Sequence, residues 1–174
     1  MECLIACVQS RRTVLLKGNH EAYLLEFLNN PSILEDWRRC GGLQTLTSYG
    51  LKPSIKPQSD EQWELARELD RLLPKNHKAL MRALPTSVVS GDFLFVHAGI
   101  RPGVPLANQA EHDLLGIRDD FLFCEDAHGK VIVHGHTPVP AVDIRPNRID
   151  IDTGAYATGK LTCLILDGEN IGVL

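Results

Sequence analysis

Three polar clusters of this chain stand directly after short apolar runs, at residues 14–16, 93–96 and 131–133. Each cluster contains a histidine, and a glycine stands close by in the sequence. Imidazole suits first-row divalent metals, and a carboxamide oxygen is a harder partner for the same ions. The residue types therefore indicate a metal site, provided that the fold brings the three runs together. The side chains concerned are Asn19, His20, His97, His134 and His136.

The apolar runs have the length and composition of short buried strands, and we expect strands at 13–16, 93–97 and 131–133. Ligands of α/β proteins collect outside the carboxyl ends of strands. If the three strands share a sheet, their ends converge on one site. Each cluster alone is a weak signal, because Gly-Asn is a common turn and a single histidine at a strand end is usually structural. The combination of a strand end, a glycine and a histidine occurs three times in this short chain, which favours a functional site.

The remaining patterns predict an α/β fold with a sheet-based core. Residues 59–73 have helical spacing, with Ser59-Asp60 as the expected cap and four apolar positions, Trp63, Leu65, Leu69 and Leu72. Gly91-Asp92 is typical of a hairpin turn. Further helices are expected at 1–8, 21–28, 32–50 (in pieces), 75–84 and 111–123, a hairpin strand at 86–90, and further strands at 148–152, 161–166 and 171–174.

Composition narrows the class of protein. The chain has 174 residues, 44% hydrophobic and 23% charged, which suits one globular domain. The net charge of -4 argues against a nucleic-acid or anionic membrane partner. No apolar run approaches the roughly 20 residues that span a bilayer. Five scattered cysteines without a CxxC pair favour free thiols in a reducing cytoplasm.

Several candidate residues have simpler interpretations. We interpret His77, His112 and His128 as surface residues, because their surroundings in the sequence are polar. Trp37 and Trp63 have side chains that could stack on a nucleobase. Core packing is the more common role for each of them.

The clusters lie within longer segments that together resemble a known family. These segments are KGNHE at 17–21, FVHAGI at 95–100, VHGHTPV at 133–139 and IDTGAYATGKLT at 151–162. They resemble the later motifs of calcineurin-like metallophosphoesterases, in particular the bacterial and phage serine/threonine phosphatase branch. Relatives of that branch include the symmetrical diadenosine tetraphosphatases. LLGIRDDF at 114–121 resembles the helix that carries a phosphate-binding arginine in that branch.

The resemblance implies a two-metal hydrolase on a β-sandwich flanked by helices. It makes Asn19, His97 and His136 ligands of one metal, with manganese, iron and zinc all suitable. It places His20 near the leaving group, as general acid or charge stabiliser. It makes Arg118 the residue that binds the substrate phosphate. Two ions can stabilise both the entering and the leaving charge of an in-line displacement. His134 and Tyr156 are expected beside the ligands or the substrate. Asp152 either orients a ligand histidine or belongs to a turn after a strand.

The sequence departs from the family at its beginning. The family opens with two further motifs, GDxHG and GDxxDRG, and neither is present here. We therefore expect one domain over 1–174, with a helical insert at about 32–84, that lacks its N-terminal strands and helices. Such a chain should expose a sheet edge and associate with itself. It should bind metal weakly and hydrolyse phosphoesters little or not at all.

Three functions fit these observations. The leading one is a serine/threonine protein phosphatase that uses a metal-activated water on a phosphorylated protein or small phosphoester. A symmetrical bis(5'-nucleosyl)-tetraphosphatase would use the same chemistry in a different substrate groove. A non-catalytic binding protein that keeps the fold is the third.

Overall fold

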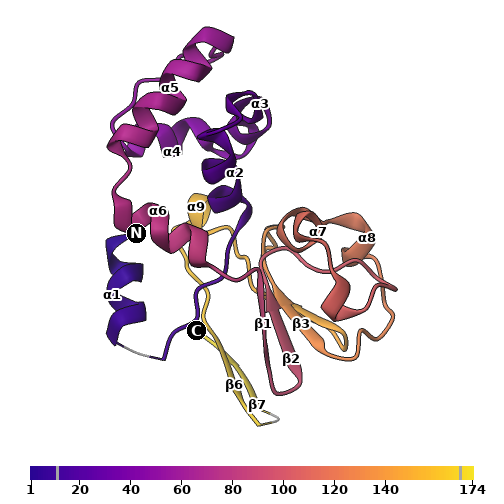
Figure 1. Ribbon diagram of the computed structural model, residues 1–174. Coiled ribbons are helices and arrows are strands. Elements are labelled where there is room, and N and C mark those ends of the chain that lie inside the picture. The colour runs from indigo at the N-terminus through magenta and orange to yellow at the C-terminus, as the bar shows by residue number, and fades with distance from the viewer. Residues whose placement is uncertain (11, 169) are drawn as a thin grey trace. The chain divides into compact units, whose positions relative to one another are not determined.

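The computed structural model describes residues 1–10, 12–168 and 170–174 (Figure 1). Its contacts divide the chain into two compact units. Met1–Leu84 forms a unit of helices, which we call the helical unit, and Pro85–Leu174 forms the sheet unit. The expected insert at 32–84 lies inside the helical unit, which begins at Met1. The expectation of a single domain with an insert stays a prediction.

The helical unit contains the helices that the apolar periodicity predicts. Its core is built from apolar side chains of all but the first of these helices, with Phe27, Leu34, Trp37, Leu46 and Leu69 fully buried. The helices are α1 (Glu2–Ser10), α2 (Asn19–Phe27), α3 (Leu34–Trp37), α4 (Gly42–Ser48), α5 (Ser59–Leu72) and α6 (Lys75–Ala83), with 3-10 turns at Pro31–Ile33 and Arg38–Cys40.

Helix α5 buries a narrower stripe than its sequence suggests. Leu65 and Leu69 are buried as predicted, but the indole of Trp63 is 53% exposed and Leu72 is also exposed. The buried face runs through positions 62, 65, 66 and 69, at the spacing of one helix face. Trp63 and Leu72 lie to either side of that face, so core packing was the wrong prediction for both. The expected Ser59-Asp60 cap is also wrong, because Gln58 is the N-cap residue.

Residues 13–16 do not form the predicted strand. They run outside any sheet, and within the described ranges they pair with no other strand. A strand requires a neighbour for its ladder of hydrogen bonds, whatever its own apolar character. Val14 is accordingly exposed rather than buried.

His77 is buried, which corrects its interpretation as a surface residue. Its Nδ1 lies 3.2 Å from the Tyr49 hydroxyl and its Nε2 lies 2.7 Å from Glu2 Oε1. The ring thereby joins α6 to α1, and the pKa of Glu2 is lowered by the hydrogen bond to His77. His112 is 79% exposed, as predicted, and His128 is half-buried.

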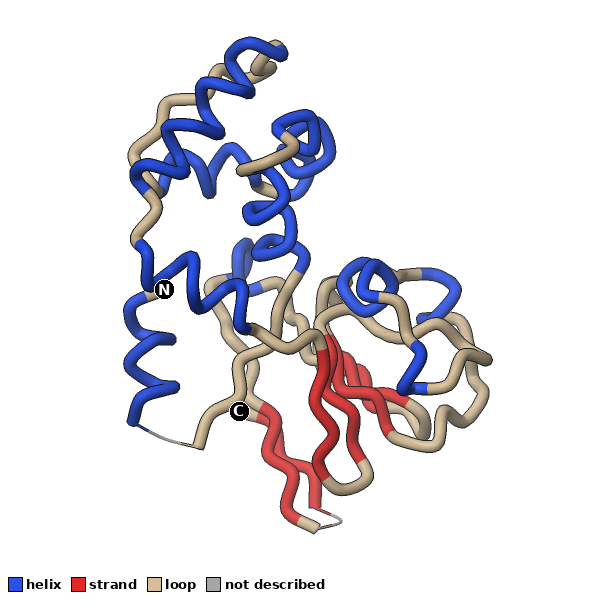
Figure 2. Tube along the Cα trace, in the orientation of Figure 1, coloured by secondary structure: helices blue, strands red, loops and turns tan. Residues whose placement is uncertain are grey.

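The sheet unit is built on a five-stranded mixed sheet in the order β1-β2-β3-β5-β4. Figure 2 shows the strands of the chain in red. β1 and β2 form the predicted hairpin, β2, β3 and β5 run parallel, and β4 is antiparallel to β5. β6 and β7 form a separate two-stranded sheet. The strands are β1 (Ser87–Ser90), β2 (Phe93–Val96), β3 (Val131–His134), β4 (Asp143–Ile144), β5 (Arg148–Asp150), β6 (Leu164–Asp167) and β7 (Asn170–Val173).

The crossover from β2 to β3 covers one face of the sheet. It contains α7 (Glu111–Gly116) and α8 (Asp119–Leu122), which replace the single helix expected at 111–123. Leu114 and Phe121 from this crossover pack against Leu94 and Ile132 of the neighbouring strands. The short helix α9 (Ala155–Thr158) follows β5. The result is the predicted α/β class, a mixed sheet flanked by helices.

Within the described ranges, no helix is both long and apolar enough to cross a bilayer.

Candidate functional site

The sheet unit brings two of its predicted site residues together at the carboxyl ends of neighbouring strands. β2 and β3 run parallel with Phe95 opposite Val133. His97 follows β2 directly and His136 lies two residues beyond β3. The backbone N–H of Gly135 donates to the His97 carbonyl at 2.9 Å, which continues the pairing past the strand ends. The prediction that these strand ends converge is confirmed for β2 and β3.

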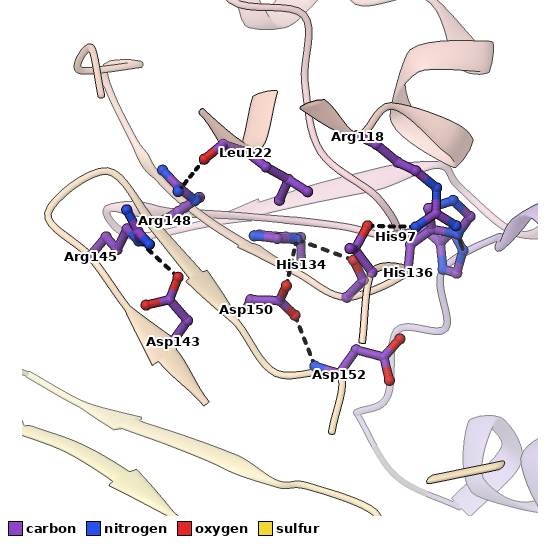
Figure 3. A network of polar contacts seen from close by, with 12 residues as sticks. His97, Arg118, Leu122, His134, His136, Asp143, Arg145, Arg148, Asp150 and Asp152 are labelled. Atoms are coloured by element: carbon purple, nitrogen blue, oxygen red, sulfur yellow. Dashed lines mark hydrogen bonds and ion pairs between the residues drawn. The ribbon is translucent and has the colours of Figure 1, made fainter. Parts of the chain in front are cut away.

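The imidazoles of His97 and His136 face each other. His97 Nε2 lies 3.1 Å from His136 Nδ1, and the ring centroids are 4.9 Å apart at an interplanar angle of 61° (Figure 3). His136 has a φ of 68°, and it is the non-glycine residue with positive φ in the described chain. Such left-handed backbone is costly for a side chain other than glycine and is concentrated at functional sites. The loop thus holds the ring in place at a local cost in energy.

The two nitrogens are spaced as two ligands of one metal ion would be. Imidazole nitrogens bound about 2.0–2.1 Å from an ion, at tetrahedral or octahedral angles, lie roughly 2.9–3.4 Å apart. The observed 3.1 Å falls within that interval. Over the described residues, no three His, Cys, Asp or Glu side chains are grouped as a metal site. The pair could therefore supply two ligands at most, and an ion held there would require others.

Arg118 reaches the loop that carries His136. It lies at the break between α7 and α8, and its Nη1 donates to the Thr137 hydroxyl at 3.0 Å (Figure 3). Arg118 also lines a surface hollow of about 350 Å³ beside helices α7 and α8. A guanidinium in this position has donors to offer an anion beside the two imidazoles.

A buried arginine that the sequence analysis missed holds the Arg118 segment against the sheet. Arg148 of β5 donates from Nη1 to the Cys124 carbonyl at 3.1 Å, and from Nη2 to the Leu122 carbonyl. Asn147 Nδ2 donates to the same Cys124 carbonyl at 2.9 Å. These bonds fasten the end of α8 to β5 (Figure 3). A charged residue in a strand predicts solvent exposure, so only its burial in three dimensions reveals this role.

His134 is buried behind the facing pair rather than presented with it. It is 1% exposed, its ring meets Phe121 edge-on at 5.0 Å, and its Nε2 has no hydrogen-bond partner among the described residues. Burial lowers its pKa to about 4, so the ring is neutral near pH 7. Its Nδ1 lies 3.9 Å from Asp150 Oδ2, and burial raises the pKa of Asp150 to about 6.

Asp150, rather than Asp152, is the aspartate that faces a histidine here. Asp152 Oδ1 accepts from the Gly154 N–H at 2.9 Å, as expected for an aspartate in a turn after a strand. Its own N–H donates to Asp150 Oδ1 at 3.0 Å. Of the two interpretations, the turn is the one with observed contacts. Tyr156 on α9 is 88% exposed, and its contact with a substrate stays a prediction.

The helical unit carries the other two predicted residues, Asn19 and His20, in the first turn of α2. The Gly18 N–H donates to Glu21 Oε2 at 2.8 Å, which closes that turn. His20 Nδ1 accepts a hydrogen bond from the indole Nε1 of Trp37 at 3.3 Å. The core packing predicted for Trp37 is confirmed, and its contact with His20 is one that its sequence position did not indicate.

Comparison with known proteins agrees at the level of fold. No family model and no curated protein matches the chain. Among solved structures, it is similar to the crystal structure of a protein described as "a putative diadenosine tetraphosphatase". The TM-score is 0.59 at 16% identity, over 93% of this chain and 68% of the other. The likeness confirms the predicted fold class and, at this identity, concerns the fold alone.

Proposed function

We propose that this chain is a metal-dependent phosphoester hydrolase. The observation that carries the proposal is the pair of facing imidazoles, His97 Nε2 and His136 Nδ1, 3.1 Å apart at the ends of parallel strands. The likeness in fold to a phosphatase-like structure supports it. So does Arg118, which reaches the same loop through Thr137 and has the planar fork that binds phosphate oxygens.

The proposed metal ligands are His97, His136 and Asn19. The first two have the spacing of ligands to one ion, and Asn19 is added from the resemblance of GNHE to the family motif. A divalent ion held there would supply a Lewis acid that polarises the phosphoryl group and activates water. Manganese, iron and zinc suit a set of imidazole and amide donors. The resemblance implies a second ion, whose usual motifs GDxHG and GDxxDRG are absent from this sequence.

The roles of the remaining residues follow the charge that the reaction develops. Arg118 would hold two phosphate oxygens and orient the ester for in-line attack. His20 would lie near the leaving-group oxygen. His134 is buried and neutral near pH 7, so it shapes the loop before His136 rather than exchanging protons there.

A phosphorylated protein is the substrate class favoured by the motif resemblance. A dinucleoside tetraphosphate is the second candidate, and the described function of the similar solved structure favours it. The two substrates differ in what must lie beside the phosphate. A phosphopeptide requires a groove for an extended chain, whereas a dinucleotide requires surfaces that stack or bond a base.

Metal binding and hydrolysis test the proposal together. Titration calorimetry with Mn²⁺ should show binding that H97A and H136A each weaken by more than about tenfold. H112A is the matched control, because His112 is an exposed histidine of the same unit. p-Nitrophenyl phosphate should be hydrolysed only with added metal, and more slowly than by family members that carry GDxHG and GDxxDRG. No Mn²⁺ binding, or equal losses in all three variants, would contradict the proposal.

The substrate is tested on the same preparations. Release of phosphate from a phosphoserine peptide would favour the protein phosphatase, and release of ADP from diadenosine tetraphosphate would favour the nucleotide hydrolase. If Mn²⁺ binds but none of the three substrates is cleaved, the chain is a binding protein that keeps the fold. A rate typical of enzymes that carry GDxHG and GDxxDRG would overturn the expectation that the activity of this chain is impaired.

A further inference from the structure

Trp37 lies against His20 inside the helical unit. The indole is fully buried at the end of α3, and its Nε1 lies 3.3 Å from His20 Nδ1. The two rings meet edge to face, with centroids 6.5 Å apart and an interplanar angle of 66°. Indole nitrogen can only donate a hydrogen bond, so the direction of this bond is fixed: Trp37 donates and His20 Nδ1 accepts.

An accepting Nδ1 determines the state of the other imidazole nitrogen. In a neutral imidazole one nitrogen accepts and the other carries the hydrogen. Because Nδ1 accepts from Trp37, the hydrogen of His20 lies on Nε2. A second hydrogen on Nδ1 would point at the indole N–H and replace the bond by two opposed donors. The contact therefore favours the tautomer with its hydrogen on Nε2.

The surroundings of the indole leave it little room to move away. Trp37 packs on Phe27 at a centroid distance of 5.7 Å. A Cβ at Gly42 would lie 2.7 Å from the indole Cγ, which is closer than any real contact. Gly41 has a φ of 102°, and a Cβ there would lie 3.5 Å from His20 Cε1. The glycine pair that interrupts the helical pattern thus makes space for the indole and borders the imidazole.

We propose that Trp37 is a positioning residue that fixes the His20 ring, so that its Nε2–H serves as a hydrogen-bond donor toward the leaving group. The inference rests on the proposed function, which places His20 beside the leaving-group oxygen.

The reaction balances without a proton from His20. The oxygen of water forms a bond to phosphorus, and the bond from phosphorus to the ester oxygen breaks with its electron pair on that oxygen. The Nε2–H of His20 donates a hydrogen bond to the oxygen as its charge grows. Water supplies both hydrogens of the products: one remains with the phosphate and the other ends on the alcohol.

The tautomer is measurable without any activity. Long-range ¹H–¹⁵N spectra of protein labelled at histidine distinguish the two neutral tautomers, and H20N identifies the signals of His20 by their loss. We expect the Nε2–H pattern in the wild-type chain and a mixture of tautomers in W37F. W63F is the matched control, because Trp63 is an exposed tryptophan of the same unit. An Nδ1–H pattern in the wild-type chain, or an unchanged spectrum in W37F, would overturn the proposal.

The wild-type spectrum alone decides the tautomer if W37F does not fold. The kinetic readout is a series of aryl phosphates with leaving groups of increasing basicity. W37F should lose roughly two- to tenfold in kcat on the most basic leaving groups, and less on the best ones, with KM and Mn²⁺ affinity unchanged. A loss that is equal across the series would indicate a merely structural role and contradict the proposal.

The two proposals fail separately. An Nε2–H tautomer in a chain that hydrolyses no phosphoester would refute the proposed function and leave the positioning of His20 by Trp37 intact. Hydrolysis by a chain in which His20 carries its hydrogen on Nδ1 would do the reverse.

Discussion

The two units hold their candidate functional side chains by different means. In the sheet unit, His97 and His136 stand at the ends of paired strands, and a backbone bond from Gly135 to His97 fixes one loop on the other. In the helical unit, His20 follows an unpaired segment and is oriented by the side chain of Trp37. Backbone pairing fixes the sheet pair, whereas side-chain packing orients His20. The units should therefore respond to different substitutions.

The largest expected effect comes from crowding the sheet unit just beyond His97. A Cβ at Gly99 would lie 2.3 Å from Cδ1 of the fully buried Phe121. Neither the backbone nor the ring can yield easily, so G99A should lower the free energy of unfolding by at least about 3 kcal/mol. Circular dichroism during urea unfolding measures the loss.

Gly103 provides the control for that substitution. It has a positive φ of 76° but open space around a Cβ, so G103A should cost only about 1 kcal/mol of backbone strain. If G99A costs no more than G103A, the loop after His97 is not held as tightly as its contacts indicate.

The buried carboxylate of the sheet unit should make stability depend on pH. Burial raises the pKa of Asp150 from 3.8 to about 6, so its stabilising contribution is present below pH 3.8 and is lost as pH rises through 6. D150N removes this loss. At pH 8 it should raise the free energy of unfolding by up to about 3 kcal/mol, with no gain below pH 4. Unfolding in urea at a series of pH values measures the difference.

The titration of His134 gives the D150N variant a characteristic dependence of its free energy of unfolding on pH. Its pKa is lowered to about 4 by burial, so its contribution is present above pH 6.5 and is lost as pH falls through 4. The two slopes oppose each other in the wild-type chain between pH 4 and 6. D150N should leave only the rise with pH that His134 produces. D92N, at an exposed aspartate of the same unit, should show neither effect, and equal profiles for the two variants would contradict the assignment.

The sheet pair was predictable because its signal is local. An apolar run followed by histidine predicts both a strand and the side chain at its end, and β2 and β3 confirm this. The same pattern at 13–16 failed, because a strand depends on a partner that the run itself does not specify. An apolar segment predicts the capacity to pair, and the rest of the chain decides whether pairing occurs.

The supporting residues were not predictable for a similar reason. Trp37 contacts His20 across 17 residues, and His77 contacts Glu2 across 75. Arg148 looks like a surface residue until its bonds to carbonyl groups of the α8 segment are seen. Apolar periodicity predicts which face of a single helix or strand is buried. The roles of these residues depend on contacts between two elements, which periodicity does not predict.

Crowding the indole should test how far the helical unit depends on side-chain packing. A Cβ at Gly42 would lie 2.7 Å from Trp37 Cγ, so G42A should cost about 2 kcal/mol and displace the indole from His20. Both tryptophans lie in the helical unit, so their fluorescence follows its unfolding. Gly50 is the control in the same unit, because a Cβ there has open space, and G50A should cost only about 1 kcal/mol for its positive φ of 92°. Equal stability of the two variants would show that the indole yields without cost.

The smallest expected effect concerns the helix start that presents Asn19 and His20. The Glu21 carboxylate accepts the Gly18 N–H at 2.8 Å and lies in the first turn of α2, where the helix dipole favours negative charge. E21A removes the hydrogen bond and the charge, and should cost about 1 kcal/mol. E21Q keeps an acceptor and loses only the charge, so it should cost about half as much. If the two variants are equally stable, charge rather than the hydrogen bond holds this turn. If neither differs from the wild-type chain, the packing of Trp37 and its neighbours alone fixes the start of α2, and the contrast between the two units is sharper than the hydrogen bonds suggest.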